Sequence, residues 1–225
     1  MRAEWGITVM PRARTIVAGR DTRQRILDAA RDLFYEKGYT ATGLAEILQR
    51  AEANSGSFYY FFESKEALLG AVLDEYVDAL RPVLLDPIYA RVRDPIDRIF
   101  ALLEKYRSLV LATGFGYACP IGRIAFEVEP EMERIHARVA ANFAGWSAAI
   151  HENLEAARDR FPRECDLRRL SVFVLTVMEG AVMQARSFKS VTPFDDSVAA
   201  LREYFEVLQR QPRSRRSRVR SSNRR

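Results

Sequence analysis

The sequence predicts an all-α fold. Apolar residues recur at intervals of three and four along most of the chain, as on one buried face of a helix, and the alternating pattern of a β-strand is almost absent. At 225 residues, 48% of them hydrophobic, the chain can bury a sizeable core in one or two domains. The helical segments are separated by prolines, which favour helix boundaries: Pro82, Pro87, Pro95, Pro120, Pro130, Pro162 and Pro193.

The first helix is predicted to begin near Thr22 and to end at Gly38, because glycine readily adopts the left-handed conformation that follows a helix. Charged side chains fall mostly on the opposite side of this helix, toward water. Its buried face combines residues three and four positions apart: Ile26, Leu27, Ala30, Leu33 and Phe34.

Two short helices are predicted next, at residues 44–50 and 55–62. Asn54 or Ser55 can cap the second of them, and Ser64 can cap the helix that follows. Two short helices joined by about four residues form the helix-turn-helix geometry, whose second helix lies in the major groove of DNA. This part of the chain is therefore predicted to bind DNA.

The order and spacing of many residues between Thr22 and Leu69 resemble the TetR family of one-component transcriptional regulators. The resemblance implies an all-α fold in which a three-helix helix-turn-helix DNA-binding domain precedes a helical ligand-binding and dimerisation domain. It rests on Thr22-Arg23, Ile26-Leu27, Ala29-Ala30, Leu33-Phe34, Gly38-Tyr39, Ala41-Thr42, Ile47, Ala51, Gly56, Tyr59, Phe62, Lys65-Glu66 and Leu68.

Three positions depart from that family's pattern. Gly43 stands where the family usually has Ser or Thr, so the capping or phosphate contact of that hydroxyl falls to Thr42 or is unmet. Glu52 replaces the usual glycine of the tight turn, where a non-glycine residue at positive φ costs roughly 1 kcal/mol. Phe61 replaces a frequent histidine and either packs in the core or meets a thymine methyl group.

The DNA contacts are assigned to the second short helix and its surroundings. We expect base-edge or groove contacts from Ser55, Ser57 and Tyr60, and phosphate contacts from Tyr59 and Lys65. The full predicted set, in which glycine lets the backbone approach DNA closely, is Thr42, Ser55, Gly56, Ser57, Tyr59, Tyr60 and Lys65.

Residues 66–211 are predicted to form a helical effector-binding and dimerisation domain after the DNA-binding domain at 20–65. The Gly116 to Gly122 segment is similar to a Gly-Cys-Pro-(Ile/Leu)-Gly element that opens the helix beside the effector cavity in one set of TetR-family proteins. A helix-breaking turn with core aromatics is the open alternative. The predicted helices lie near 65–81, 95–112, 121–129, 131–160, 166–188 and 194–210.

An effector cavity needs large apolar side chains with a few polar atoms among them, and ordinary core packing is the alternative role for each candidate. Glu179, within an apolar run, is expected to contact a ligand, to pair with Arg186 or to be exposed. The set indicates an apolar or aromatic effector. Its members are Tyr106, Phe115, Tyr117, Cys119, Phe126, Phe143, Trp146, Phe173 and Met178.

The last two helices are predicted to form the interface of a homodimer through an antiparallel four-helix bundle, although their pattern alone says only that these faces are buried. The predicted interface residues are Leu170, Val174, Val177, Ala181, Val198, Leu201, Phe205 and Leu208.

Charge distribution supports DNA attraction at one end of the chain. The whole chain carries a formal net charge of +5, of which residues 212–225 contribute +7, because they hold seven arginines and no acid. Residues 1–65 carry +2, with ten basic and eight acidic side chains, and residues 66–211 therefore carry −4. Residues 1–19 are expected to be a flexible arm and 212–225 a disordered basic tail that adds phosphate contacts or only solubility. Either Met1 or Met10 can be the first residue of the translated protein. Arg12 and Arg14 of the arm are candidates to enter a minor groove of DNA.

Two cysteines without C-x-x-C spacing fit a reducing cytoplasm, and neither a bilayer-spanning run of about 20 apolar residues nor a secretory signal is evident. The predicted function is a ligand-responsive transcriptional repressor that binds a palindromic double-stranded DNA operator as a homodimer, with no cofactor, no metal and no catalytic residues. A redox or electrophile sensor acting through Cys119 and a transcriptional activator remain alternatives. An enzyme is disfavoured because the motifs of hydrolases and nucleotide-binding enzymes are missing.

Overall fold

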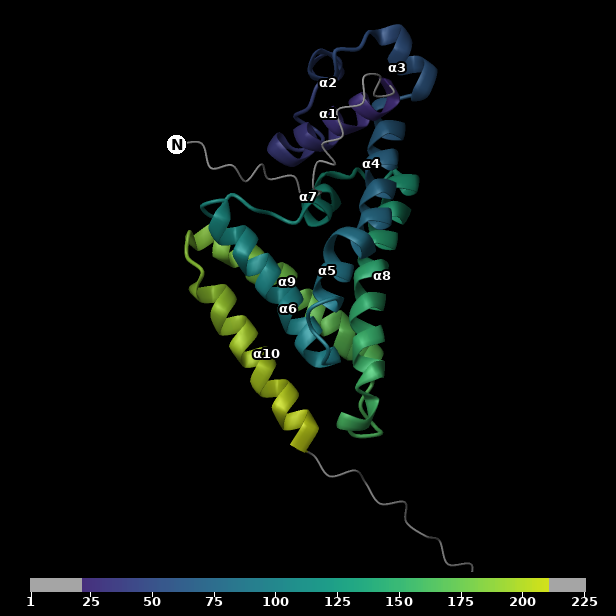
Figure 1. Cartoon of the computed structure of the whole chain (residues 1–225). Coiled ribbons are helices and arrows are strands. Elements are labelled where there is room, and N and C mark those ends of the chain that lie inside the picture. The colour runs from purple at the N-terminus through teal and green to yellow at the C-terminus, as the bar shows by residue number, and fades with distance from the viewer. Residues whose placement is uncertain (1–21, 211–225) are drawn as a thin grey trace, which may run out of the picture.

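The computed structural model describes residues 22–210, and in this range the regular structure is entirely helical, as predicted (Figure 1). The expectations for the N-terminal arm and for the basic tail lie outside the described residues. In chain order the elements are α1 (Thr22–Lys37), α2 (Leu44–Ala51), α3 (Ser55–Phe61), α4 (Lys65–Ala79), a π-helical turn (Leu80–Leu85), α5 (Asp86–Tyr89), α6 (Pro95–Ala112), α7 (Pro120–Glu127), α8 (Glu133–Ala156), a 3-10 turn (Arg158–Arg160), α9 (Leu167–Phe188) and α10 (Thr192–Arg210).

Local signals in the sequence define the helix ends of the head, the name used here for residues 22–62. Gly38 follows α1 at φ 95, in the left-handed region that glycine tolerates. The Asn54 side chain caps α3 by accepting the Ser57 N–H at 2.8 Å, and Ser64 caps α4 by accepting the Ala67 N–H at 3.0 Å. These three predictions are confirmed.

The start of α2 lacks a side-chain cap. Its N-cap residue is Gly43, and the neighbouring Thr42 is buried, with its hydroxyl donating to the Gly38 carbonyl at 2.6 Å. Thr42 therefore closes the loop between α1 and α2 and does not cap α2. At the other end of α2, Glu52 adopts φ 50, so the predicted non-glycine residue in the left-handed region is present.

The helix after the head is longer than Pro82 predicts. Regular α-helix ends at Ala79, but the helical path continues through the π-helical turn and α5. A π-helix has five residues between hydrogen-bonded groups in place of four, and this wider turn accommodates the ring of Pro82 and its missing N–H. The remaining predicted helices agree with the structure within a few residues at each end.

The body is arranged around α8 (Figure 1). α4 runs down from the head beside α8, α9 packs on the other side of α8, and α10 packs on α9. The buried Asn142 amide of α8 donates from Nδ2 to the Leu73 carbonyl of α4 at 3.0 Å. Nearby, Arg138 pairs with Asp74 at 3.0 Å, so one buried and one exposed polar contact join α4 to α8.

Two hydrophobic clusters form the core, and the head cluster extends beyond the head. Besides α1, α2, α3 and the first part of α4, it contains Cys119, Ile121 and Ile124 at α7, and Ile135 and Val139 of α8. The division into domains at residue 65 stays a prediction, but apolar packing crosses that boundary. The head therefore rests on α7 and α8 as well as on α4.

Candidate nucleic-acid interface and ligand groove

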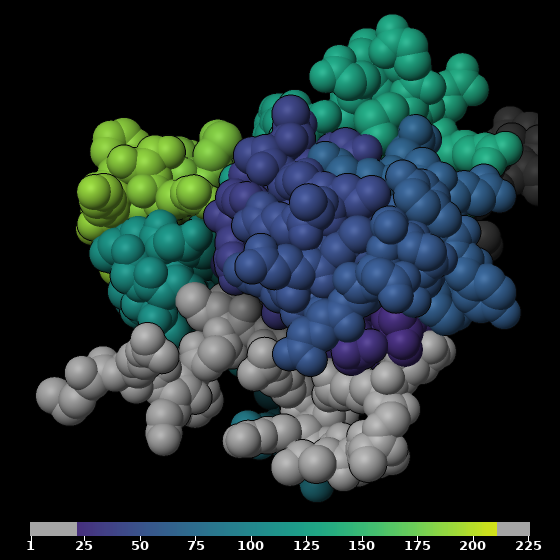
Figure 2. All heavy atoms as spheres, turned by 90° about the horizontal axis from the view of Figure 1, so that it is seen from above, coloured from purple at the N-terminus to yellow at the C-terminus, as the bar shows by residue number. Residues whose placement is uncertain are grey.

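The surface of α3 combines buried anchors with exposed aromatic side chains. Phe58 is 0% exposed and Phe62 is 5% exposed, so both fix the short helix to the head core. Tyr59 and Tyr60 are 60% and 83% exposed. In Figure 2, which looks onto the end of the molecule that carries the head, the blue atoms of this region face the viewer. A helix held in this way can present its outer side to a DNA groove.

The smaller predicted contact residues on α3 share this accessible side. Ser55 and Gly56 are exposed and Ser57 is half-buried. Phe61 is half-buried, with its ring 4.8 Å from the ring of Tyr60. The structure thus brings five of the seven predicted DNA-contacting residues together on one short helix.

The other two, Thr42 and Lys65, brace the loop before α2. Thr42 is only 1% exposed, which leaves its hydroxyl almost no surface for a phosphate. Lys65 donates from Nζ to the carbonyls of Tyr39 and Thr42, both at 2.8 Å, and lies 4.2 Å from the centre of the Tyr39 ring. Burial lowers the pKa of Lys65. Both residues therefore stabilise the loop between α1 and α2.

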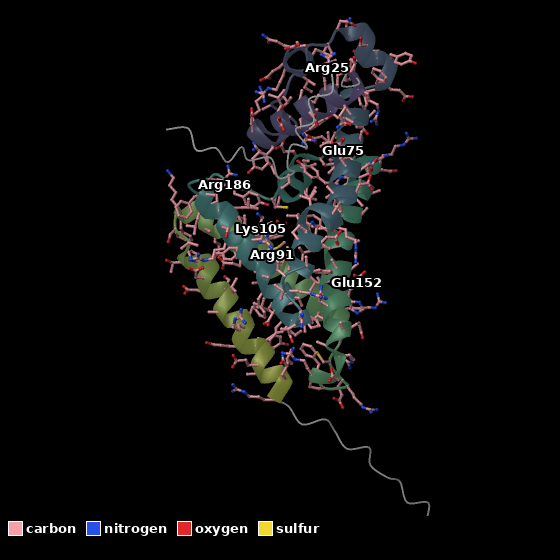
Figure 3. The ribbon with its side chains drawn as sticks, viewed as in Figure 1. Arg25, Glu75, Arg91, Lys105, Glu152 and Arg186 are labelled. Carbon is pink, nitrogen blue, oxygen red and sulfur yellow. The ribbon has the colours of Figure 1, made fainter. Side chains whose placement is uncertain are left out.

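Positive charge beside α3 comes from residues that the sequence patterns did not assign to DNA contacts. The α3 segment itself carries no charged residue. Arg25, labelled in Figure 3, donates to the Glu52 carbonyl just before α3 at 3.3 Å, and Arg23 lies over the Phe62 ring just after α3, 5.4 Å from its centre. The sequence shows these arginines on the hydrophilic side of α1, but only the packing places them at the two ends of α3.

The predicted effector residues do not surround one cavity. A cavity of about 30 Å³, lined by Tyr106, Tyr117 and Trp146 among others, has room for about one water. A separate groove of about 880 Å³ is lined by α7, α8 and α9 and includes Phe126 and Phe143. Of these two spaces, the groove has the volume of a typical ligand site.

The remaining members of the predicted set have different positions. Cys119 lines both the cavity and the groove. Phe115, Phe173 and Met178 line neither: Met178 is buried in the body core, Phe115 packs against that core, and the ring of Phe173 lies 5.8 Å from that of Tyr204. Helical periodicity identified apolar side chains here, but it did not separate the groove wall from the core.

A thiol and a carboxyl meet where α7 begins. The Cys119 sulfur accepts the Gly122 N–H at 3.4 Å, and the Cys119 thiol also forms a hydrogen bond with Glu179 of α9. A Cβ on Gly122 would lie 2.9 Å from Glu179 Oε2, so glycine permits this approach. Burial raises the pKa of Cys119, and the nearby Glu179 raises it further. Burial also raises the pKa of Glu179. The Glu179 carboxyl is hydrogen-bonded to Cys119, so its partner is this thiol and not Arg186.

Most of the residues predicted for a dimer interface contribute to the core of their own chain. Leu170, Val174, Ala181, Leu201 and Phe205 are each at most 5% exposed in the single chain, so little of their surface is left for a partner. Val177, Val198 and Leu208 are half-buried against the same core. A different set of apolar side chains is exposed on these helices: Val172, Phe173, Met183, Phe188, Tyr204 and Val207.

Other site classes find no support in the described part of the chain. Between residues 22 and 210, no group of three or more His, Cys, Asp or Glu side chains is placed to hold a metal ion. Nor does any helix in this range have the length and apolar character needed to cross a membrane.

Two family models match the chain. Residues 26–72 match the model of bacterial regulatory proteins of the tetR family. Residues 95–200 match the model of the C-terminal domain of LmrA/YxaF-like transcriptional regulators. These matches cover the head with the start of α4, and most of the body.

The chain is also similar to proteins that are named as HTH-type transcriptional regulators. An uncharacterized HTH-type transcriptional regulator in the lacX 3' region of Lactococcus lactis subsp. lactis is 32% identical over 137 residues, which are 61% of this chain and 70% of that protein. The HTH-type transcriptional repressor DhaR of Mycobacterium sp. (strain GP1) is 27% identical over 190 residues, 83% of this chain and 91% of DhaR.

A solved structure agrees on the fold. The reduced form of Escherichia coli NemR superposes with a TM-score of 0.71 and 24% identity, over 82% of this chain and 97% of NemR. The helix-turn-helix head, the helical body and the matches to both family models lead to one assignment: the chain belongs to the TetR family of helix-turn-helix transcriptional regulators.

Proposed function

We propose that this regulator is a repressor that binds a nearly palindromic operator as a homodimer and releases it when a small apolar effector binds. The observation that carries the proposal is α3, a short helix with buried Phe58 and Phe62 and with Tyr59 and Tyr60 exposed between flanking arginines. Two such helices, one from each subunit, would read half-sites about one helical turn apart or a multiple of it.

The dimer surface that we propose is the exposed apolar face of α9 and α10. Phe173 and Tyr204 pack edge to face on this surface, and Val207 extends it. A contiguous apolar surface of this kind is typical of an interface with another protein chain. The two-fold symmetry of a homodimer would match the symmetry of a palindromic operator.

Effector control requires a difference in affinity between two forms of the protein. An effector that binds better to the form with misplaced heads will deplete the DNA-binding form. The groove of about 880 Å³ is the candidate effector site, because it combines ligand size with apolar walls. α4 begins at the head and packs along α8, so its movement with the body would change the separation of the two heads.

Replacing Tyr60 by alanine tests the proposed interface. The side chain is 83% exposed, so the fold should tolerate its loss, whereas operator affinity should fall about tenfold or more if it contacts a base or the groove wall. Operator fragments are first selected from genomic DNA with purified protein, and affinities are then measured by fluorescence anisotropy at fixed salt. Arg210→Ala, at the far end of α10, is the control. Equal affinities for wild type and Tyr60→Ala would exclude α3 as the reading helix.

Replacing Phe173 by glutamate tests the proposed dimer. A dimer would bury the new carboxylate in an apolar interface, so the variant should be monomeric and should lose operator binding. Sedimentation velocity gives the oligomeric state, and circular dichroism verifies the fold. Glu203→Gln, on the neighbouring helix α10, is the control. A Phe173→Glu protein that remains dimeric would refute this surface.

Two alternatives differ in their support. A thiol sensor needs a reactive thiolate, but burial and Glu179 both raise the pKa of Cys119, which lowers the thiolate fraction. An activator would use the same head, and the position of the recovered operator relative to the promoter distinguishes it from a repressor.

A further inference from the structure

The proposed effector groove and the head are joined directly by α7. Arg123 of α7 donates from Nη1 to the carbonyl of Tyr35, near the end of α1, at 2.9 Å. One turn later, Glu127 accepts the N–H of Thr40 at Oε2, at 2.8 Å. The last carbonyls of a helix have no partner within the helix and favour a nearby positive charge. Arg123 therefore supports the end of α1 from outside the head.

Close packing keeps this contact tight. A Cβ added to Gly38 would lie 2.3 Å from Glu127 Oε1, so the head and α7 approach each other through a position that only glycine can occupy. Arg123 Nε also donates to Glu127 Oε1 at 3.3 Å. The two α7 side chains thus form one unit that holds the loop between α1 and α2.

Arg123 also lines the groove, together with Arg186 of α9. The hydrogen bonds of Arg123 use Nε and Nη1, which leaves Nη2 without such a partner among residues 22–210. The side chain of Arg186 is exposed and forms no hydrogen bond or ion pair within the same range. Burial raises the pKa of the Tyr35 hydroxyl, and the positive charges of Arg186 and Arg123 oppose this shift, so both guanidinium groups lie near that hydroxyl. Figure 3 shows Arg186 at the end of the body nearest the head.

The residues that line the groove carry two positive charges and one negative charge, and Glu127, which pairs with Arg123, is not among them. The charged lining residues are Arg123, Arg186 and Glu179. Glu179 is turned toward Cys119 and Gly122 at the start of α7, and burial raises the pKa of its carboxyl group. The other walls are mostly apolar, with Phe126, Phe143 and Met183 among them. Such a site complements an apolar molecule with one anionic end.

We propose that the effector is a small apolar anion whose charged group pairs with Arg123 and Arg186, and that Arg123 transmits its binding to the head. This inference rests on the proposed effector control of operator binding. A carboxylate that binds both Nη2 and Nη1 of Arg123 in a bidentate pair displaces the Tyr35 carbonyl from Nη1, because a charged acceptor binds more strongly than a neutral one. The end of α1 then loses its external support, and the form of the head that binds DNA is disfavoured.

Matched ligands test the charge requirement. Calorimetry with the full-length protein compares alkyl carboxylates, from hexyl to dodecyl, and naphthoate with the corresponding primary amides and alkyltrimethylammonium ions. At least one carboxylate should bind about tenfold or more tightly than its amide, a ratio that corresponds to about 1.4 kcal/mol. Arg186→Gln should reduce this ratio, and Arg91→Gln, an exposed arginine outside the groove lining, should not. The proposal is overturned if no carboxylate in the series is preferred, or if Arg186→Gln leaves the ratio unchanged.

Coupling to the head is tested with Arg123→Gln and the selected operator. The measured quantity is the ratio of operator affinities with and without the preferred carboxylate. This ratio should approach one in Arg123→Gln, whereas purely structural damage would lower both affinities and leave the ratio as in wild type. Glu133→Gln, on exposed α8 surface, is the control. If wild type binds the operator and only neutral or cationic ligands release it, the inference fails and the proposed function stands. If wild type binds no operator selectively, the proposed function fails.

Discussion

Replacement of Glu52 by glycine should stabilise the head. Glu52 adopts φ 50 after α2, and a non-glycine residue in this left-handed region costs about 1–2 kcal/mol. The greater freedom of glycine in the unfolded chain offsets about 0.5–1 kcal/mol of the relief. A net gain on the order of 0.5–1 kcal/mol is therefore expected. Glycine retains the backbone contacts, since Arg25 bonds to the Glu52 carbonyl and the Glu52 N–H bonds to the Gln49 carbonyl.

Urea denaturation followed by circular dichroism measures this gain against two matched variants. Glu52→Ala keeps the backbone strain and should leave the unfolding free energy close to that of wild type. Gln49→Gly places glycine at an exposed position inside α2, where it should cost about 1 kcal/mol. If Glu52→Gly is as destabilising as Gln49→Gly, left-handed strain at Glu52 is not a significant cost and the reasoning is refuted.

Two further predictions concern the buried pair between α7 and α9. Burial raises the pKa of Glu179, so its protonated form stabilises the fold in acid, and this contribution is lost as the pH rises through the folded-state pKa. Glu179→Gln should therefore gain stability relative to wild type above about pH 4.3, the ordinary pKa of glutamate, and thermal melts that differ equally at all pH values would contradict this. Cys119→Ser should leave the oxidant response of operator binding unchanged, because the raised pKa of the Cys119 thiol keeps it protonated; a response abolished by this substitution would support the thiol sensor.

The helices of the head could be predicted from the sequence because local signals define them. Gly38, Asn54 and Ser64 act on backbone groups within a few residues of themselves, so their identity and position are sufficient. The role of Lys65 was not predictable in this way. Its bonds reach carbonyls that lie 23 and 26 residues earlier in the chain, and only the packed head brings these groups together.

The faces of α9 and α10 show a second limit of sequence patterns. Their periodicity identifies which residues share a buried face, and Leu201 and Phe205 are indeed buried. Periodicity does not distinguish burial in the same chain from burial against a partner. For the same reason, the contact of Arg123 with Tyr35, which lies 88 residues earlier, has no signal in the sequence.

The buried amide of Asn142 restricts how α4 can move. If α4 slid along α8 by even one turn, the Asn142 amide and the Leu73 carbonyl would be separated in a place that water does not reach, at a cost of about 1–3 kcal/mol. Tilting the two helices together preserves the bond. A signal from the body should thus reach the two DNA-reading helices through a rotation of α4 together with α8, and not through a sliding of α4 along α8.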